Sequence, residues 1–393
     1  EKETQEKKRL AGELEKNQKS TATAAALKEL EQRVSGDEEL IAQLRENCRQ
    51  TALLIERQSK EKSPAIQRIG KGFRYIGSWA DARRTIILQM RDRLGNQMFI
   101  YALYCRLKSM GRNVAIDDAS WYLHTPAGKN ALKDAFRLEY KTAGADAVRA
   151  LEDTGEHRFD RLRRKLFGRR SLKYSEQSFQ YDPVFLRAKK GYFTGWFQDP
   201  RYFQPVAGQV RESFGFDMDA LRRSETAGPL YREITERKHA VSIHLRYGDY
   251  LKPDNAAKYG GICSAAYYCA GIRYFRELFP DDRVDYYVFS DDTGKAEEWI
   301  RDVFEPLRTD RENAHIVSNE KVTADNLQMA LMSACHHHII ANSTFSWWAA
   351  FLNPSKEKII IRPSVWFFEN GKSIQPLSTD VPAVTIAPDG EIL

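Results

Sequence analysis

The sequence contains no long apolar run. Nothing in its 393 residues approaches the roughly eighteen uninterrupted apolar residues that a membrane-spanning helix needs, and the first thirty residues are charged rather than apolar. We therefore expect neither a spanning helix nor a secretory signal within this sequence. The start at Glu1 instead of Met is what removal of an upstream segment would leave.

Cysteines are few and odd in number. The five, at positions 48, 105, 263, 269 and 335, include no pair at a metal-binding spacing. We expect reduced thiols in a cytoplasmic protein, with peripheral attachment to the inner membrane as one alternative. A lumenal protein of Golgi type is another alternative, because the N-terminus looks trimmed. The only Asn-x-Ser/Thr sequence, at 342–344, lies in an apolar segment and argues little for glycosylation.

Convincing metal and nucleic-acid motifs are also missing. His336, His337 and His338 are consecutive. Successive residues entering a strand point to opposite faces and cannot share one tetrahedral ion well, so we expect no metal. No recognition helix or aromatic strand platform accompanies the basic residues, which argues against a nucleic-acid partner.

Positive charge is in excess and unevenly placed. The net charge of +7 arises from 61 basic and 54 acidic residues, and residues 157–173 (HRFDRLRRKLFGRRSLK) are strongly basic. Phe159, Leu162 and Leu166 stand there at helical spacing, which predicts a basic amphipathic helix. Such a helix can expose a solvated charged face, bind acidic ligands, or contact an anionic membrane peripherally.

Residues 1–60 predict a coiled-coil-like helical extension. They are rich in Glu, Lys, Gln and Ala, and from Leu27 to Ile55 the apolar positions follow alternating steps of three and four. We expect a stem or oligomerisation helix, and hence a homo-oligomer. The alternative is a helix that packs against the rest of its own chain. Residues 61–82, which contain Pro64, are expected to form a linker.

From residue 83 onward, buried strands alternate with helices. Residues 85–90 (TIILQM) predict a strand, followed by a loop at 91–97, a helix at 98–110 and a strand at 114–116, which together indicate a parallel sheet. Further strands are predicted at 240–245, 286–290, 315–317, 338–341 and 358–361. We therefore predict an α/β protein with two Rossmann-like lobes facing a cleft, the first at 83–235 and the second at 236–393.

Residues 244–250 (HLRYGDY) close one of these strands and turn sharply at Gly248. Open α/β folds bind ligand phosphates at the carboxyl ends of strands, and a guanidinium fork matches two phosphate oxygens at once. Arg246 is therefore a candidate diphosphate clamp. A surface ion pair between Arg246 and Asp249 is the alternative.

Residues 342–353 (NSTFSWWAAFLN) predict a short helix directly after a strand. Ser343, Thr344 or Ser346 can cap this helix. The first N–H groups of the helix then either bind an anion or serve only as partners of the capping side chain. The two adjacent tryptophans, Trp347 and Trp348, are predicted to be core residues because rings of that size need burial.

Two more segments end where such sheets bind ligands. Residues 286–292 (YYVFSDD) end in a pair of acids, and Asp291 or Asp292 would either cap the next helix or accept the N1–H and amino group of guanine. The predicted loop that contains Gly95 and Asn96 lies at the equivalent edge of the first sheet.

These segments resemble the α-1,2-fucosyltransferase family, which includes bacterial O-antigen enzymes. The LGNQMF sequence at 94–99 with Tyr101 and Ala102, then HLRYGDY, FSDD and NSTFSWW, follow the order and spacing of the family's motifs. Residues 191–203 (GYFTGWFQDPRYF) look like its aromatic-Gln segment. The resemblance covers about residues 83–370 and leaves residues 1–80 outside it.

The resemblance implies a GT-B fold, GDP-L-fucose held mainly by the second lobe, inversion at the anomeric carbon, and no required metal or other cofactor. Arg246 would grip the β-phosphate, His244 would orient the nucleotide, and Asp291 or Asp292 would read guanine. Asn96 would reach the diphosphate or fucose, and Gly95 would let the backbone of the first lobe approach. Phosphate would also be held by the segment Ser343, Thr344, Phe345 and Ser346.

Two departures from the family pattern concern charge. Tyr247 stands where the family usually shows a second arginine, and Asp92-Arg93 replaces a Gly-Gly pair, so Arg93 is a candidate for the missing cation. Asp249 is the nearest acidic candidate for a general base, with orientation of Arg246 as its alternative role.

We predict an inverting glycosyltransferase that moves L-fucose from GDP-fucose to a hydroxyl of a galactoside or related glycan, forming an α-1,2 linkage. The alternatives are a fucosyltransferase of different linkage, an enzyme for another GDP-sugar, and a noncatalytic coiled-coil scaffold whose lobe binds a GDP-sugar or glycan.

Overall fold

The structure is a computed structural model. It describes residues 81–393 except 124, 126–129, 155–157 and 169–170, together with residues 46, 47, 49–51, 75 and 79. Most of the predicted extension at 1–60 and of the linker at 61–82 therefore lies outside the described residues. Within the described part, no helix is both long enough and apolar enough to cross a membrane.

The first lobe is built on a parallel sheet of four strands in the order β2-β1-β4-β3. Its central strand β1 is short, apolar and almost wholly buried, as expected for a strand covered on both faces. The strands are β1 (Ile86–Gln89), β2 (Val114–Asp117), β3 (Lys173–Ser175) and β4 (Gly191–Thr194).

Helix α5 (Leu94–Ser109) connects β1 to β2, which confirms the predicted strand-helix-strand unit. The helix begins four residues earlier than the predicted start at 98. The reason is local, because the N–H groups of Asn96 and Gln97 already bond to the carbonyl of Arg93. The predicted loop at 91–97 is therefore wrong for its last residues, which form the first turn of α5.

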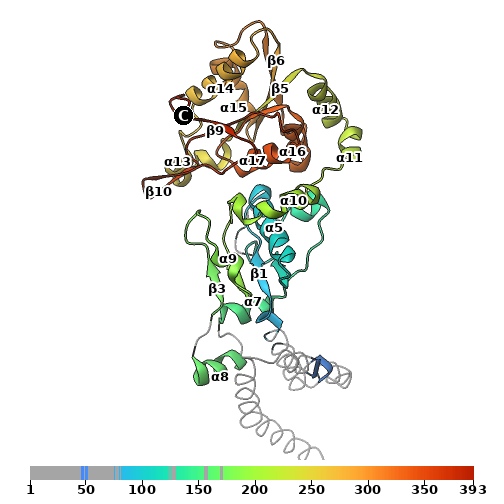
Figure 1. The fold of residues 1–393 in the computed structure, drawn as a ribbon, viewed down its shortest axis with the longest axis vertical. Coiled ribbons are helices and arrows are strands. Elements are labelled where there is room, and N and C mark those ends of the chain that lie inside the picture. The colour runs from blue at the N-terminus through green and yellow to red at the C-terminus, as the bar shows by residue number, and fades with distance from the viewer. Residues whose placement is uncertain are drawn as a thin grey trace, which may run out of the picture.

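Short helices surround the first sheet. The basic helix predicted from residues 157–173 is α8, and it lies at the end of this lobe farthest from the second lobe (Figure 1). It ends at Phe167, next to Gly168 with a φ of +72°. The other helices are α6 (Leu132–Phe136), α7 (Ala145–Glu152), α9 (Val184–Arg187), η1 (Pro200–Tyr202), η2 (Gln204–Val206) and α10 (Ala207–Ser213).

The second lobe contains a parallel sheet of six strands in the order β12-β9-β8-β5-β6-β7. Every residue of β6 is buried, because helices cover both faces of the sheet (Figure 1). The strands are β5 (His239–Leu245), β6 (Val284–Ser290), β7 (Glu312–Val317), β8 (His337–Ile339), β9 (Ile360–Pro363) and β12 (Ala383–Ile386). The predicted α/β architecture with two Rossmann-like lobes is confirmed.

Helices and a hairpin complete the second lobe. The predicted boundary at residue 235 falls within α12, a helix that packs against α16 of the second lobe. The helices are α11 (Met218–Arg223), α12 (Ala227–Glu236), η3 (Gly248–Leu251), α13 (Pro253–Tyr259), α14 (Ala265–Leu278), α15 (Thr293–Trp299), η4 (Ile300–Phe304), α16 (Asp325–Ala334) and α17 (Thr344–Leu352). Strands β10 (Phe367–Glu369) and β11 (Lys372–Ile374) form the antiparallel hairpin.

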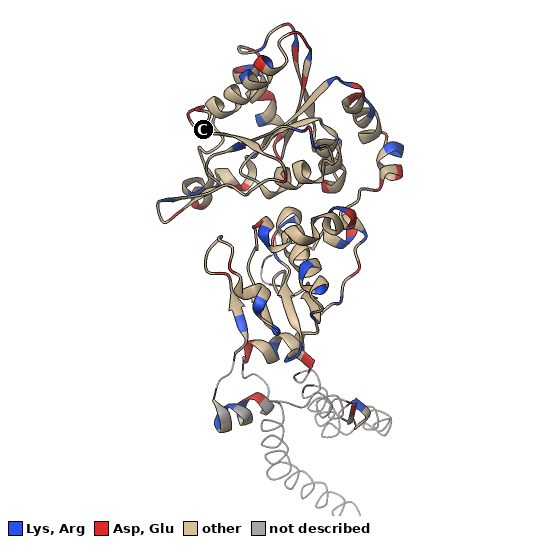
Figure 2. Cartoon of the chain, in the orientation of Figure 1, with Lys and Arg blue, Asp and Glu red and all other residues tan. Residues whose placement is uncertain are grey.

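An aromatic core joins the two lobes where α5 meets α17. Trp348 of α17 lies 4.8 Å from Phe99 of α5 and 5.5 Å from Phe203, measured between ring centroids. Both Trp347 and Trp348 are almost fully buried, so their prediction as core residues is confirmed. Helix α17 contains no charged residue (Figure 2). The lobes therefore share one hydrophobic core on this side.

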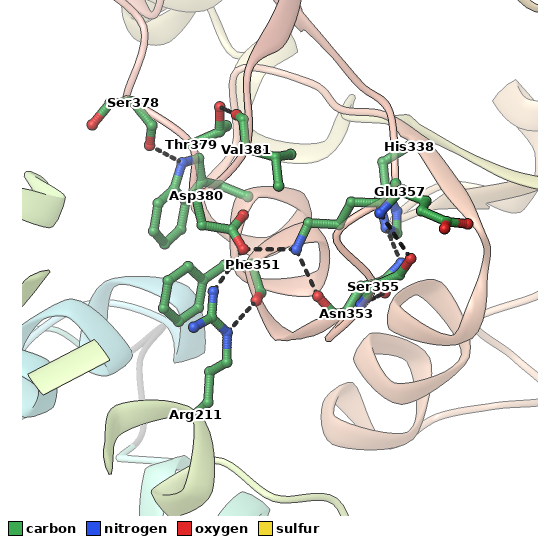
Figure 3. A network of polar contacts seen from close by, with 12 residues as sticks. Arg211, His338, Phe351, Asn353, Ser355, Glu357, Ser378, Thr379, Asp380 and Val381 are labelled. Carbon is green, nitrogen blue, oxygen red and sulfur yellow. Dashed lines mark hydrogen bonds and ion pairs between the residues drawn. The ribbon is translucent and has the colours of Figure 1, made fainter. Parts of the chain in front are cut away.

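A buried ionic network reinforces the junction (Figure 3). Arg211 of α10 donates to the carbonyl of Phe351 at 3.0 Å and pairs with Asp380 at 2.6 Å. Asp380 also pairs with the ammonium of Lys358 at 2.8 Å. That ammonium donates to the carbonyl of Asn353, and the Lys358 side chain has no exposed surface. One carboxylate thus balances two cations, one from each lobe.

We expect Asp380→Ala to destabilise the protein by about 3 to 5 kcal/mol, because it leaves the buried Lys358 ammonium without its counter-charge. Urea unfolding followed by fluorescence measures the effect. Asp281→Ala is the control, since Asp281 is 95% exposed and meets Arg311 only at 3.5 Å. Equal unfolding midpoints for the two variants would contradict this account of the network.

Candidate functional site

A cavity of about 670 Å³ lies between the lobes. It opens at the carboxyl ends of β5 and β6 and at the amino ends of α5 and α17, which is where doubly wound folds bind ligands. Most of the predicted site residues line it, namely Gly95, Asn96, His244, Arg246, Asp249, Asp291, Ser343, Thr344 and Phe345.

Arg246 follows β5 and enters the cavity with its guanidinium held between two carboxylates. One terminal nitrogen is 2.5 Å from Asp249 and the other is 2.7 Å from Asp291. The predicted alternative, an ion pair with Asp249, is therefore present as well. The Arg246 side chain is only 16% exposed, and the two acids fix the direction of its guanidinium.

Gly248 makes this arrangement possible. A Cβ atom at Gly248 would collide with the Asp291 carboxylate. That carboxylate also accepts the backbone N–H of Tyr247 at 2.9 Å. The turn after β5 thus needs a residue without a side chain, so that Asp291 can reach both Tyr247 and Arg246.

His244 is buried, with its ring centroid 5.9 Å from that of Phe345. Burial, with a smaller effect of the Arg246 charge, lowers the pKa of His244 to about 3, so the ring is neutral at pH 7. Its Nδ1 atom has no hydrogen-bond partner among the described residues. A buried polar atom without a partner beside a cavity is suited to a ligand group.

The amino end of α17 is open toward the first lobe. Ser343 is its N-cap residue, but no side chain caps the helix. Asn96 of α5 lies against this end and accepts hydrogen bonds from Thr344 at 3.3 Å and from Gln198 at 2.8 Å. The first N–H groups of α17 and the amide side chains therefore meet at one place, where an anion would be favourable.

Two predicted residues lie outside the cavity lining. Asp292 caps α15 by accepting the N–H of Lys295 at 3.0 Å, which was the alternative for this acid. Ser346 is fully buried and donates to the carbonyl of Ser343 at 3.3 Å. Of the acidic pair, only Asp291 faces the cavity, because neighbouring residues at a strand end point in different directions.

Arg93 supplies a second cation from the first lobe. Its guanidinium is 3.7 Å from the Asp249 carboxylate, it is 60% exposed, and it lines the cavity. Tyr247 does not line the cavity, and its ring lies 6.0 Å from the ammonium of Lys295. The position of Arg93 in the cavity lining suits its candidate role as the second cation of the site.

The sequence analysis missed several lining residues. Asp325 and Gln328 line one end of the cavity from the start of α16, and Asn319 lines it beside the Asp291 turn. Gln198 lies in the aromatic-Gln segment but was not singled out. The other end is lined by Phe179, Trp196, Lys258, Tyr259, Trp366 and Phe367. No spacing signal identifies these residues, because they come from segments far apart in the chain.

The consecutive histidines have structural partners. His336 and His337 each accept a backbone N–H group, and His338 bonds to Ser242 at 2.8 Å and to Asn353 at 3.0 Å. Over the described ranges, no group of three His, Cys, Asp or Glu residues could hold a metal ion.

Gly95→Ala tests the contact between the lobes. A Cβ at this position would lie 2.5 Å from the Thr344 hydroxyl and 3.0 Å from the Phe345 nitrogen, so α17 would have to shift. We expect a loss of about 1 to 3 kcal/mol in unfolding free energy and a marked loss of GDP binding, measured by calorimetry. Gly208→Ala in α10 is the control, because nothing lies within 4 Å of its Cβ. Unchanged GDP affinity in the Gly95 variant would contradict the assignment.

Comparison with known proteins places the chain in a family. The model of glycosyl transferase family 11 matches residues 172–369. The O-antigen biosynthesis glycosyltransferase WbnK of Escherichia coli is 29% identical over 71% of this chain and 94% of that protein. An alpha-1,2-colitosyltransferase of Escherichia coli is 28% identical over 72% of this chain and 92% of that protein. Galactoside alpha-(1,2)-fucosyltransferase 1 of Alouatta caraya is 28% identical over 66% of this chain and 63% of that protein.

The matched segment contains the strand end with Arg246, the Asp291 turn and the amino end of α17, and it spans half of the chain. The chain therefore belongs to glycosyl transferase family 11 and is a glycosyltransferase.

Proposed function

We propose that this glycosyltransferase moves L-fucose from GDP-L-fucose to a hydroxyl of a galactoside or related glycan, forming an α-1,2 linkage with inversion. The observation that carries the proposal is the convergence of the Arg246 fork and the open amino end of α17 on one cavity. The relatives named for α-1,2 transfer to galactosides and for colitosyl transfer support the same reaction type.

The proposed chemistry depends on stabilising the leaving diphosphate. As the glycosidic bond breaks, negative charge builds on the β-phosphate, and donors placed in advance lower the barrier without reorganising. Arg246 would bind this phosphate through the N–H groups that Asp249 and Asp291 leave free, since a guanidinium has five donors. The N–H groups at Thr344 and Phe345 and the free nitrogen of His244 would add further donors or acceptors.

Asp249 acts in this proposal as a positioning residue, with general-base catalysis as its second candidate role. It lies between Arg246 and Arg93, 2.5 Å from the first and 3.7 Å from the second. A carboxylate between two cations holds both side chains toward the cavity and links the lobes across it. For guanine recognition, Asp291 was the predicted candidate, but its two oxygens already bind Arg246 and the N–H of Tyr247. Asp325, which lines the same cavity, is therefore a second candidate.

Arg246→Ala should lower kcat by roughly 10² to 10³, or about 3 to 4 kcal/mol, while the protein still folds. Arg246→Lys should recover little activity, because an ammonium cannot reproduce the fork. Release of GDP from GDP-fucose in the presence of lactose measures the rate. Arg283→Ala is the control, since Arg283 is 58% exposed and precedes β6 at the opposite edge of the sheet. Near-wild-type turnover in both Arg246 variants would overturn the assignment.

A related donor, GDP-colitose, is the second candidate because of the colitosyltransferase relative. Colitose is L-fucose without its 3-hydroxyl group. A site that hydrogen-bonds a hydroxyl discriminates strongly against the analogue that lacks it, because its polar groups are then unpaired. Asn96, Gln198 and Asp249 are polar side chains that line the cavity, and a hydrogen bond from one of them to the 3-hydroxyl would favour GDP-fucose in kcat/KM by at least about tenfold.

Parallel assays with the two donors and a galactoside panel, with EDTA present, decide between these functions. A preference for GDP-colitose would replace fucose as the donor. Binding of GDP-fucose without any GDP release over the panel would contradict the proposed donor and acceptor.

We also propose a cytoplasmic protein that contacts the inner membrane peripherally through residues 157–173. The support is the basic composition of α8, in which Leu166 is 50% exposed beside Lys165. Asn342 is only 4% exposed and donates to the carbonyl of Trp366, so the sequence at 342–344 offers no accessible glycan site. Oligomerisation through residues 1–60 stays a proposal, because those residues are mostly outside the described structure.

A further inference from the structure

One end of the cavity combines a cation with aromatic walls. Lys258, in the last turn of α13, has its ammonium 4.8 Å from the ring centroid of Phe367 and 5.3 Å from that of Tyr259. The ring of Phe179, from the first lobe, is 5.5 Å away. All four residues line the cavity. The ammonium therefore sits where both lobes contribute aromatic faces.

Lys258 differs from the arginines of the cavity in having no acidic partner. Arg246 and Arg93 both meet the Asp249 carboxylate, whereas no carboxylate among the described residues lies within ion-pair distance of Lys258. Aromatic faces attract a cation but do not neutralise its charge. The Lys258 ammonium is thus available to pair with an anionic ligand.

This cation is separate from the proposed phosphate clamp. The stacked rings of Tyr250 and Tyr259, with centroids 4.5 Å apart, lie between them. Arg246 contacts the Tyr250 ring at 5.3 Å, and Lys258 contacts the Tyr259 ring. The hydroxyl of Tyr250 is fixed by a bond to the carbonyl of Asn342 at 2.7 Å. A diphosphate on Arg246 would therefore lie on the other side of this stacked pair.

The aromatic walls are held rigidly. Trp196 stacks on Phe179 with ring centroids 5.1 Å apart, and its indole N–H donates to Asp92. Its backbone N–H donates to Glu176 at 2.7 Å, and Arg91 covers its ring at 4.5 Å. Phe179 and Arg91 cover the faces of Trp196, so this cluster offers a ligand a wall of fixed ring edges. An apolar wall of this kind suits the C–H side of a pyranose ring.

We propose that this end of the cavity binds an acceptor sugar that carries an anionic group, and that Lys258 determines this specificity. The inference rests on the proposed function, because it assigns the acceptor side of the same cavity. The aromatic side chains would bound the sugar ring on its apolar side, and Lys258 would pair with its carboxylate or phosphate. The alternative role for Lys258 is a purely structural contact between Phe179 of the first lobe and Phe367 of the second.

The test uses matched disaccharides with the full chain and GDP-fucose. The pair β-galactosyl-glucose and β-galactosyl-glucuronate differs only in one carboxylate, and β-galactosyl-glucose 6-phosphate distinguishes phosphate from carboxylate as the anion. We expect kcat/KM to favour an anionic acceptor by roughly tenfold or more, with the preference falling as salt is raised. The ratio of kcat/KM for the anionic acceptor to kcat/KM for the neutral acceptor should fall close to one in Lys258→Met. Lys258→Arg should keep most of the wild-type preference.

Lys252→Met is the control, since Lys252 is exposed just before α13 and does not line the cavity. It should keep the wild-type ratio. A wild-type ratio near one, or an unchanged ratio in Lys258→Met, would overturn the inference while transfer itself still supports the proposed function. Loss of the ratio in Lys258→Arg as well would favour the structural role.

A second readout separates the two proposals. If GDP-fucose is not turned over with any acceptor, the proposed function fails. Quenching of tryptophan fluorescence by β-galactosyl-glucuronate then decides the inference alone, because Trp196 is part of the wall. Binding that is lost in Lys258→Met would support the anionic saccharide site, and no binding would overturn it.

Discussion

The close approach of α5 and α17 is the constraint on which the rest of the structure depends. Gly95 lies so near Thr344 and Phe345 that no side chain fits between them. The indole of Trp348 donates to the carbonyl of Gly95 at 2.9 Å, so backbone and core are joined at the same place. Because these two helices begin side by side, the amino end of α17 faces the first lobe and the cavity has donors from both lobes.

The two arginines of the cavity are paired with acids. Asp249 and Asp291 hold the Arg246 fork, and Asp249 also meets Arg93 of the other lobe. Such pairing keeps a half-buried arginine ordered, at the expense of some of its positive potential. The diphosphate of a bound GDP-sugar would therefore compete with these carboxylates for the guanidinium N–H groups. The backbone N–H groups at the start of α17 are important because they have no such competitor.

Sequence reasoning predicted the parts of the site that are local in the chain. The apolar strand before Arg246, the turn at Gly248 and the helix after Ser343 each carry a short-range signal, and the structure brings all three to one cavity. The parallel sheets and the burial of Trp347 and Trp348 followed from pattern and size.

Features that depend on the direction of side chains or on distant contacts were missed or wrong. The first turn of α5 was assigned to a loop, because Gly95 and Asn96 are turn residues in most contexts. Asp292 and Ser346 point away from the cavity, which adjacent positions in a motif do not reveal. Lys258, Phe179 and Phe367 meet only after the lobes pack, so no window of sequence contains them together.

The shared aromatic core and the Arg211 link restrict how nucleotide can leave. Arg211 is bound to Phe351 and Asp380, so a wide hinge opening would break a buried ion pair and separate the rings of Phe99 and Trp348. The rim of the cavity, bordered by η3, α13 and the β10-β11 hairpin, lies outside this shared core. Local movement of these rim segments would therefore admit a ligand at a smaller energetic cost than separation of the two lobes.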